Sequence, residues 1–151
     1  MLKKINSQIR DVKFGLNCKI VEPVNLYECN LGKNVFIGPF VEITKGVTIG
    51  NNTKVSSHSF ICELVTIGND CFIGHGVMFT NDLFKNGKLG GGVKNWKPTS
   101  IGNNVLIGSN STILPVKIIS GCVIGAGSVV TKDCLKKGIY AGNPAKLLRE
   151  L

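Results

Sequence analysis

A six-residue period is the feature that most constrains the fold of this sequence. Counted in sixes from residue 31, every first position up to residue 79 holds a large apolar side chain: Leu31, Ile37, Ile43, Ile49, Val55, Ile61, Ile67, Ile73 and Phe79. Side chains repeat about every 3.6 residues in an α-helix and every second residue in a strand, so neither element explains this period. It is typical of a solenoid in which six residues form one side of a triangular coil and three sides close a turn.

In such a coil the first-position side chain points inward and stacks on its equivalent in the next turn, roughly 4.8 Å along the axis. Glycine often follows this position, where it relieves crowding or accepts a backbone angle that other residues resist. These glycines are Gly32, Gly38, Gly50, Gly68 and Gly74. The period therefore predicts an all-β fold, a parallel β-helix.

The period extends beyond this region on both sides. Towards the N-terminus it is loose and slips by one residue before Leu31, which indicates an early coil with an irregular corner; a separate N-terminal extension is the alternative. Residues 1 to about 11 carry no repeat and are expected to cap the first coil. After the interruption the period resumes at Ile101, Ile107 and Ile113. It is one residue shorter at Pro115 and continues at Ile118, Ile124 and Val130.

Two segments depart from the repeat. Residues 81–100 form a long loop, and insertions in solenoids usually serve binding. The tail, residues 133–151, turns away through Gly142-Asn143-Pro144, and a short helix is expected after Pro144 as a cap on the open end. We therefore expect one domain spanning residues 1–151, with a loop at 81–100 and a C-terminal cap at 133–151.

Composition narrows the partners. The net charge of +9 indicates polyanionic ligands, but the lysines are scattered and not interleaved with aromatic residues, so phosphates of small molecules are favoured over nucleic acid. The six cysteines form no Cys-x-x-Cys pair and are interpreted as reduced structural thiols. No apolar run is long enough to span a bilayer and no signal peptide is evident, so a cytoplasmic location without a membrane span is expected.

Two runs in the middle third carry a resemblance to a known family. They are Ser57-His58-Ser59-Phe60-Ile61-Cys62-Glu63 and Ile73-Gly74-His75-Gly76-Val77-Met78-Phe79-Thr80-Asn81-Asp82. With the hexapeptide period, the sequence resembles the hexapeptide-repeat acyltransferases, and within them the nucleotide-linked amino-sugar N-acetyltransferases of surface-polysaccharide synthesis. The resemblance implies a left-handed parallel β-helix, a homotrimer, acetyl-coenzyme A as co-substrate, and a nucleotide-linked amino sugar as acceptor.

Residue spacing identifies a candidate acceptor site. Glu63 and Asn81 are eighteen residues apart, each two places after an inward residue, so they are expected to stack where the long loop begins, beside Asp82. Carboxylate and amide oxygens accept N–H bonds and can orient the lone pair of an amine. We assign Glu63 and Asn81 as catalytic and Asp82 as substrate-binding; two solvated corner residues are the alternative.

The two histidines are weaker candidates. His75 is a candidate base and His58 a candidate substrate contact, with structural or interface roles as alternatives. Two histidines cannot supply the three zinc ligands of a γ-class carbonic anhydrase, which shares this fold, and no metal site is predicted. In a bacillosamine-type branch of the family, a catalytic histidine occupies the register held here by Glu63. The proton is then taken by Glu63, by Asn81 with Asp82, or by the departing thiolate.

The resemblance also implies a coenzyme site in the second half of the chain. The pantetheine arm would lie along Gly108, Ser109 and Ala126, and Asn143-Pro144 would pack on the adenine. Candidate phosphate ligands are Lys132, Lys146 and Arg149, a solvated basic end being the alternative. Trp96, the only tryptophan, either stacks on a nucleotide base or packs the loop onto the solenoid.

Two other functions remain open from the sequence. One is O-acetylation of a sugar or serine hydroxyl, a poorer nucleophile that normally requires a strong base such as histidine. The other is a non-catalytic β-helix that serves as a binding or assembly subunit.

Overall fold

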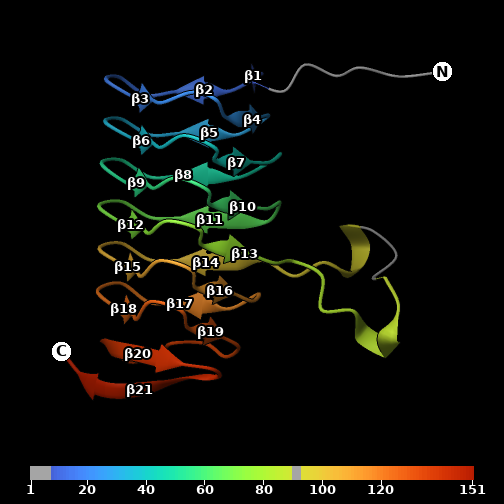
Figure 1. Cartoon of the computed structure of the whole chain (residues 1–151), viewed down its shortest axis with the longest axis vertical. Helices are drawn as coiled ribbons and strands as arrows, with labels where there is room; N and C mark the ends of the chain where they lie inside the picture. The colour runs from blue at the N-terminus through green and yellow to red at the C-terminus, as the bar shows by residue number, and fades with distance from the viewer. Residues whose placement is uncertain (1–7, 90–92) are drawn as a thin grey trace.

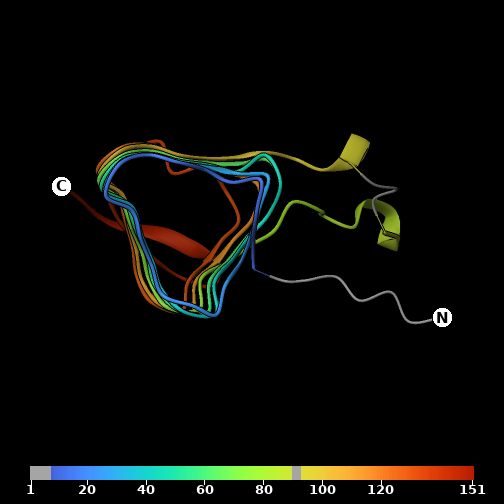
Figure 2. The same cartoon turned by 90° about the horizontal axis from the view of Figure 1, so that it is seen from above.

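The computed structural model of the protein describes residues 8–89 and 93–151. Within these ranges the chain winds into a stack of triangular coils whose sides are three parallel sheets (Figures 1 and 2). Sheet A comprises β1 (Ile9–Arg10), β4 (Asn25–Tyr27), β7 (Glu42–Ile43), β10 (Phe60–Ile61), β13 (Met78–Phe79), β16 (Thr112–Ile113) and β19 (Val129–Val130). Sheet B comprises β2 (Lys13–Phe14), β5 (Asn30–Leu31), β8 (Thr48–Ile49), β11 (Val65–Ile67), β14 (Thr99–Ile101) and β17 (Lys117–Ile118).

Sheet C comprises β3 (Lys19–Ile20), β6 (Phe36–Ile37), β9 (Lys54–Val55), β12 (Phe72–Ile73), β15 (Leu106–Ile107), β18 (Val123–Ile124), β20 (Gly138–Gly142) and β21 (Ala145–Glu150). Each coil passes through sheets A, B and C in that order, and sheet A has seven strands, one for each turn. The predicted left-handed parallel β-helix is confirmed.

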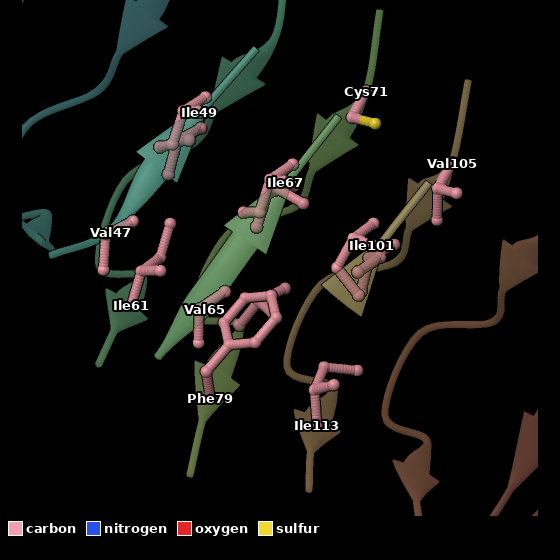
Figure 3. Packing of buried hydrophobic residues seen from close by; sticks show 14 of the residues in the cluster. Val47, Ile49, Ile61, Val65, Ile67, Cys71, Phe79, Ile101, Val105 and Ile113 are labelled. Atoms are coloured by element: carbon pink, nitrogen blue, oxygen red, sulfur yellow. The ribbon is translucent and has the colours of Figure 1, made fainter. Parts of the chain in front are cut away.

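The core is a stack of inward-facing aliphatic side chains. All nine first-position residues from Leu31 to Phe79 are buried, each with at most 3% of its surface exposed, as predicted. Equivalent residues pair in register, so Ile61 lies on Ile43 and Ile67 lies between Ile49 and Ile101 (Figure 3). A second inward position, two residues earlier, was not predicted; it holds small residues such as Val47, Val65, Cys71 and Val105.

The corners are tight turns that contain a residue in the left-handed region. At the corner between sheets B and C these residues are mainly amides: Asn17, Asn34, Asn52, Asp70 and Asn104 have φ between 55° and 58°. Asparagine and aspartate tolerate this conformation better than other residues that have a side chain. The side chains also join successive turns, since the Asn34 amide donates to Asn52 and the Asn52 amide to Asp70, both at 2.9 Å.

The first coil is continuous with the rest. β1 pairs with β4, β2 with β5 and β3 with β6, so the segment from Ile9 is part of the solenoid. The early coil with an irregular corner is therefore confirmed, and the alternative of a separate extension is wrong. The cap expected from residues 1 to about 11 falls mostly on residues 1–7, which lie outside the described ranges.

The C-terminal prediction needs correction. The tail after Pro144 is strand β21, not a helix, and it pairs antiparallel with β20 at the end of the stack (Figure 1). β20 itself extends sheet C by pairing with β18, which leaves its outer edge of N–H and C=O groups without a further coil. Pairing with β21 satisfies those groups, which a helix cannot do for a strand edge.

The six thiols are free, and all but Cys18 are buried, as their interpretation as structural residues predicts. Among the described residues, no helix has the length and apolar character needed to cross a bilayer.

Candidate functional site

The long loop leaves the solenoid at the corner between sheets A and B. Ile67 in β11 pairs with Ile101 in β14, 34 residues later, whereas Ile43 and Ile61 in regular coils are 18 residues apart. The extra chain projects sideways from this corner and contains two short 3-10 turns, η1 (Lys85–Gly87) and η2 (Val93–Asn95) (Figures 1 and 2). A bond of 2.9 Å from the Lys97 amide to the Asn81 carbonyl joins the two ends of the loop.

A cleft of about 370 Å³ lies where the loop meets the outer face of sheet A. It is lined by Tyr27, Glu42, Thr44, Phe60, Cys62, Glu63, Phe79, Thr80, Asn81, Asp82, Phe84 and Trp96. Four of the six residues predicted for catalysis or substrate binding are therefore together: Glu63, Asn81, Asp82 and Trp96. The volume suits part of a small ligand, and the mixture of aromatic walls with a few polar groups is typical of ligand sites.

Glu63 and Asn81 are neighbours in successive turns, as their spacing predicts. The contact differs in detail, because the Asn81 side-chain amide donates to the main-chain carbonyl of Glu63, at 3.3 Å, rather than to its carboxylate. One Asp82 carboxylate oxygen accepts a bond of 2.9 Å from the Phe84 amide and so shapes the first turn of the loop. The corner thus presents one amide and two carboxylate side chains to the same cleft.

A third carboxylate, Glu42, faces the cleft from β7. Burial raises the pKa of the Tyr27 phenol and the negative charges of Glu42 and Glu63 raise it further, while a bond to Thr44 and the positive charge of Arg10, whose guanidinium lies 5.0 Å from the centroid of the Tyr27 ring, lower it. The charged residues that line the cleft are the carboxylates Glu42, Glu63 and Asp82, in a chain whose net charge is +9. A cationic or hydrogen-donating group such as an amine is the complementary ligand.

Sequence reasoning missed the cleft residues that come from sheet A, which are Tyr27, Glu42 and Phe60, and it missed Thr44, which directly follows β7. A signal for one of them was present, since Glu42 directly precedes the inward Ile43 and so occupies the outward position of its strand. Glu42 pairs in register with Phe60, one turn on. Cys62 also lines the cleft, but burial raises its pKa to about 11, so at neutral pH it is a thiol and not a nucleophile.

The two histidines lie at another corner, between sheets C and A. The Ser57 hydroxyl and His75 Nδ1 are 2.8 Å apart, and the His75 amide donates to the Ser109 hydroxyl at 3.1 Å. His58 is exposed and stacks on Phe40, with ring centroids 4.8 Å apart. Neither histidine lines the cleft, which is one side of the triangle away, so the predicted acceptor site divides between two corners within one chain.

The candidate pantetheine residues share the histidine corner. Ser109 lies one turn beyond His75 and one turn before Gly127, through the bonds Asn110 N to His75 O and Gly127 N to Ser109 O, each 2.8 Å. Gly108 has a structural explanation that needs no ligand, because a Cβ there would lie 2.4 Å from the Ala126 backbone nitrogen of the next coil. Ala126 is exposed and borders the same column.

The remaining coenzyme candidates are spread over the C-terminal end. Asn143 and Pro144 form the turn between β20 and β21 at the histidine corner, and Lys146 pairs with Ala141 close to it. Arg149 pairs with Ile139 at the opposite end of the hairpin, and Lys132 follows β19 at the corner between sheets A and B. All five side chains are exposed, but in one chain they do not form a single cluster.

Among residues 8–89 and 93–151, no group of three or more His, Cys, Asp or Glu side chains is arranged to hold a metal ion.

Comparisons with known proteins agree with this geometry. The family model "Bacterial transferase hexapeptide (six repeats)" matches residues 28–63, and "Hexapeptide repeat of succinyl-transferase" matches residues 98–132. Among curated proteins, the bifunctional protein GlmU of Streptococcus uberis is 39% identical over 121 residues, which cover 80% of this chain and 24% of that protein. The chain therefore spans about a quarter of the length of this relative.

Solved structures show the same coil. AntD, an N-acyltransferase from Bacillus cereus solved as a mutant in complex with dTDP and coenzyme A, aligns with a TM-score of 0.73 and 22% identity over 94% of this chain and 82% of its own. The polySia-specific acetyltransferase NeuO aligns with a TM-score of 0.62 and 29% identity over 95% of this chain and 78% of its own. Matches to hexapeptide models in both halves, together with the triangular coil and its inward aliphatic columns, show that the chain belongs to the hexapeptide-repeat family of left-handed β-helix proteins.

Proposed function

We propose that the protein is an acetyl-coenzyme A-dependent N-acetyltransferase that acts on the amino group of a nucleotide-diphosphate-linked amino sugar. The observation that carries the proposal is the cleft beneath the loop, where Glu42, Glu63 and Asp82 surround a partly aromatic cavity together with Asn81. AntD, an N-acyltransferase solved with dTDP and coenzyme A, has the same fold, which supports the choice of ligands.

The cleft residues suit an amine acceptor. The carboxylates of Glu42 and Glu63 attract the ammonium form, and Asn81 beside Glu63 offers an amide oxygen that accepts an N–H bond. Transfer forms the bond from the amine nitrogen to the acetyl carbon and breaks the bond from that carbon to sulfur. The proton that the ammonium loses before attack goes to a carboxylate of the cleft, and the second N–H proton goes to the departing thiolate.

The complete site would combine two chains of a homotrimer. Within one chain the cleft and the column of Gly108, Ser109 and Ala126 lie at different corners of the triangle. A neighbouring chain that packs against sheets A and C would bring its own coenzyme column beside the cleft. His75, with its ring held by Ser57, would then stand close to the acceptor of the neighbour.

The composition of the outer faces supports this packing. The outward residues of sheet B are polar throughout: Lys13, Asn30, Thr48, Thr66, Ser100 and Lys117. Sheet C begins with Lys19 but then presents Phe36, Phe72, Leu106 and Val123. They are interrupted by Lys54, whose ammonium lies 5.2 and 5.7 Å from the centroids of the two phenyl rings. An apolar face beside a polar one is the distribution expected of a subunit interface.

O-acetylation is the second candidate. A hydroxyl acceptor needs a base that is held in a fixed orientation, and the hydrogen bond between Ser57 and His75 holds the imidazole in this way. The variants His58→Asn and His75→Asn separate the two reactions. An amine acceptor predicts a modest loss of turnover in both, whereas near-complete loss in His75→Asn favours a hydroxyl acceptor.

The direct test is release of the coenzyme A thiol in the presence of dTDP- and UDP-linked 3-amino and 4-amino sugars, with the wild type beside Asn81→Ala. We expect turnover of one amino sugar and a fall of at least about 100-fold in the variant, as for loss of a positioning contact in an active site. Binding of coenzyme A without turnover of any amino sugar would contradict the amine acceptor. If coenzyme A also failed to raise the melting temperature, the protein would be a non-catalytic β-helix.

A further inference from the structure

The loop beside the cleft has a charge opposite to that of the cleft. Between Asp82 and Pro98 the sequence contains four lysines and no acidic residue. These are Lys85, Lys88, Lys94 and Lys97, and all four are exposed. Among the described residues, Glu42, Glu63 and Asp82 line the cleft and no lysine or arginine does, although the guanidinium of Arg10 lies 5.0 Å from the centroid of the Tyr27 ring. Negative charge is thus concentrated at the base of the cleft and positive charge along the loop above it.

Two aromatic side chains connect these regions. Phe84, from the outgoing limb of the loop, and Trp96, from the returning limb, both line the cleft, and Phe84 remains 57% exposed. Lys85 directly follows Phe84, and Lys97 directly follows Trp96. Each limb therefore presents an aromatic ring to the cleft beside a cation that faces solvent. The bond between Lys97 and Asn81 fixes the returning limb to the corner that holds the candidate catalytic amide.

The ligand that matches this arrangement has a cation at one end and, at the other, an aromatic ring with phosphates. An amine fits between the carboxylates, a nucleobase stacks on an aromatic face, and phosphate oxygens accept charge-assisted bonds from lysine. A free amino sugar lacks the second half of this pattern. A simple anion lacks the first, and the cleft carboxylates repel it.

We propose that the loop is a nucleoside-diphosphate subsite, in which Phe84 and Trp96 contact the base and Lys85 and Lys97 bind the diphosphate of the acceptor. The assignment deepens the proposed function, since it rests on that function for the identity of the bound amine. It separates acceptor phosphates, at the loop, from those of coenzyme A, at the C-terminal end. The loop then determines that the acceptor is nucleotide-linked, while the carboxylates determine that it carries an amine.

The experiment uses Trp96 as an intrinsic probe, because the chain has no other tryptophan. Quenching of its fluorescence is measured on titration with dTDP, UDP, inorganic pyrophosphate, thymidine and coenzyme A, and calorimetry supplies affinities without an optical signal. The test variant is Lys85→Gln with Lys97→Gln. The matched control is Lys13→Gln with Lys33→Gln, which removes two exposed charges from the first coils, away from the loop. Thermal melts verify that each variant is folded.

We expect dTDP or UDP to quench Trp96 and to bind about tenfold more weakly to the loop variant, with affinity unchanged in the control. Pyrophosphate and thymidine should each bind more weakly than dTDP, because dTDP carries both the base and the diphosphate. Coenzyme A should bind the loop variant as well as it binds the wild type. The difference between loop variant and wild type should shrink at high salt, because screening weakens contacts to exposed charges.

Equal dTDP affinity in wild type and loop variant would overturn the subsite, and so would a loss confined to coenzyme A, which would place the donor nucleotide at the loop. These readouts need no turnover. Suppose that the wild type acetylates no amino sugar but binds dTDP, and that the loop variant loses this binding. The subsite would then be supported and the proposed function would be wrong. Turnover of an amino sugar with no nucleotide binding at Trp96 would do the reverse.

Discussion

At the scale of single residues, the inward positions come in pairs and the second member of each pair is small. Cys29, Cys71 and Cys122 occupy this second position, as Val47 and Val65 do in other coils, whereas Cys134 is buried in line with the first-position residue Ile118. Burial raises the pKa of Cys29 to about 11 and that of Cys134 to about 12. These thiols are therefore packing residues whose chemistry is suppressed.

A first prediction follows for alkaline pH. In the unfolded chain these thiols lose their protons near the ordinary pKa of 9.0, whereas folding raises the pKa to about 11 for Cys29 and about 12 for Cys134. The stability that each contributes is complete below pH 9 and is lost as the pH rises towards the pKa of that thiol in the folded chain, on the order of 1–2 kcal/mol for each thiol. Urea unfolding at pH values on both sides of 9 should show a smaller pH dependence in Cys29→Val with Cys134→Val than in the wild type. Identical slopes would contradict the assignment, because other titrating groups are common to both proteins.

A second prediction concerns Glu42. If its carboxylate attracts the acceptor amine, Glu42→Gln should raise the KM for the amino sugar about tenfold and change kcat little, the pattern of a lost binding contact. Steady-state kinetics measure both constants, with Glu22→Gln, an exposed residue of the first coil, as the control. A fall in kcat at unchanged KM would instead place Glu42 in the chemical step.

At the scale of the coil, glycines keep successive turns in register. A Cβ at Gly68 would lie 2.6 Å from the carbonyl oxygen of Gly102 in the next turn, and backbone there cannot move without shifting the whole coil. At Gly46, which has a φ of +77°, a Cβ would meet nothing within 4 Å. The two glycines therefore serve different purposes, close approach in one and backbone conformation in the other.

The third prediction compares these two positions. Gly68→Ala should lower the free energy of unfolding by about 3 kcal/mol or more through overpacking, and Gly46→Ala by about 1 kcal/mol through left-handed strain alone. Chemical denaturation measures both values. A smaller loss at Gly68 than at Gly46 would show that coil spacing yields more easily than the contact distances indicate.

At the scale of the whole molecule, sheets B and C have outer faces of different character. Sheet B is polar, whereas sheet C places Phe36, Lys54 and Phe72 side by side across three coils. The proposed homotrimer buries the apolar face and completes the site across subunits. The assembly and the activity should therefore be lost together.

The fourth prediction tests this coupling. Phe72→Glu should shift the protein to a smaller assembly in light scattering and abolish acetyl transfer, because the interface would lose an apolar contact and would have to desolvate a charge. Thr66→Glu, an exposed position in the neighbouring strand of sheet B, should change neither property. An unchanged molar mass in Phe72→Glu would remove sheet C from the interface.

The sequence alone determined the coil, its inward columns, and the proximity of Glu63 and Asn81, because in a solenoid a fixed residue spacing is itself a contact in space. It did not determine what depends on surfaces brought together from different periods. The tail became a strand because the edge of β20 required a partner, although the local signal after Pro144 favoured a helix. Glu42 lines the cleft because sheet A places it in register with Phe60 of the next coil. The histidines lie at a different corner from Asn81 because one side of the triangle, sheet A, separates the two corners. Tertiary structure decided these features, since they depend on edges, corners and the path of the loop, which carry no period.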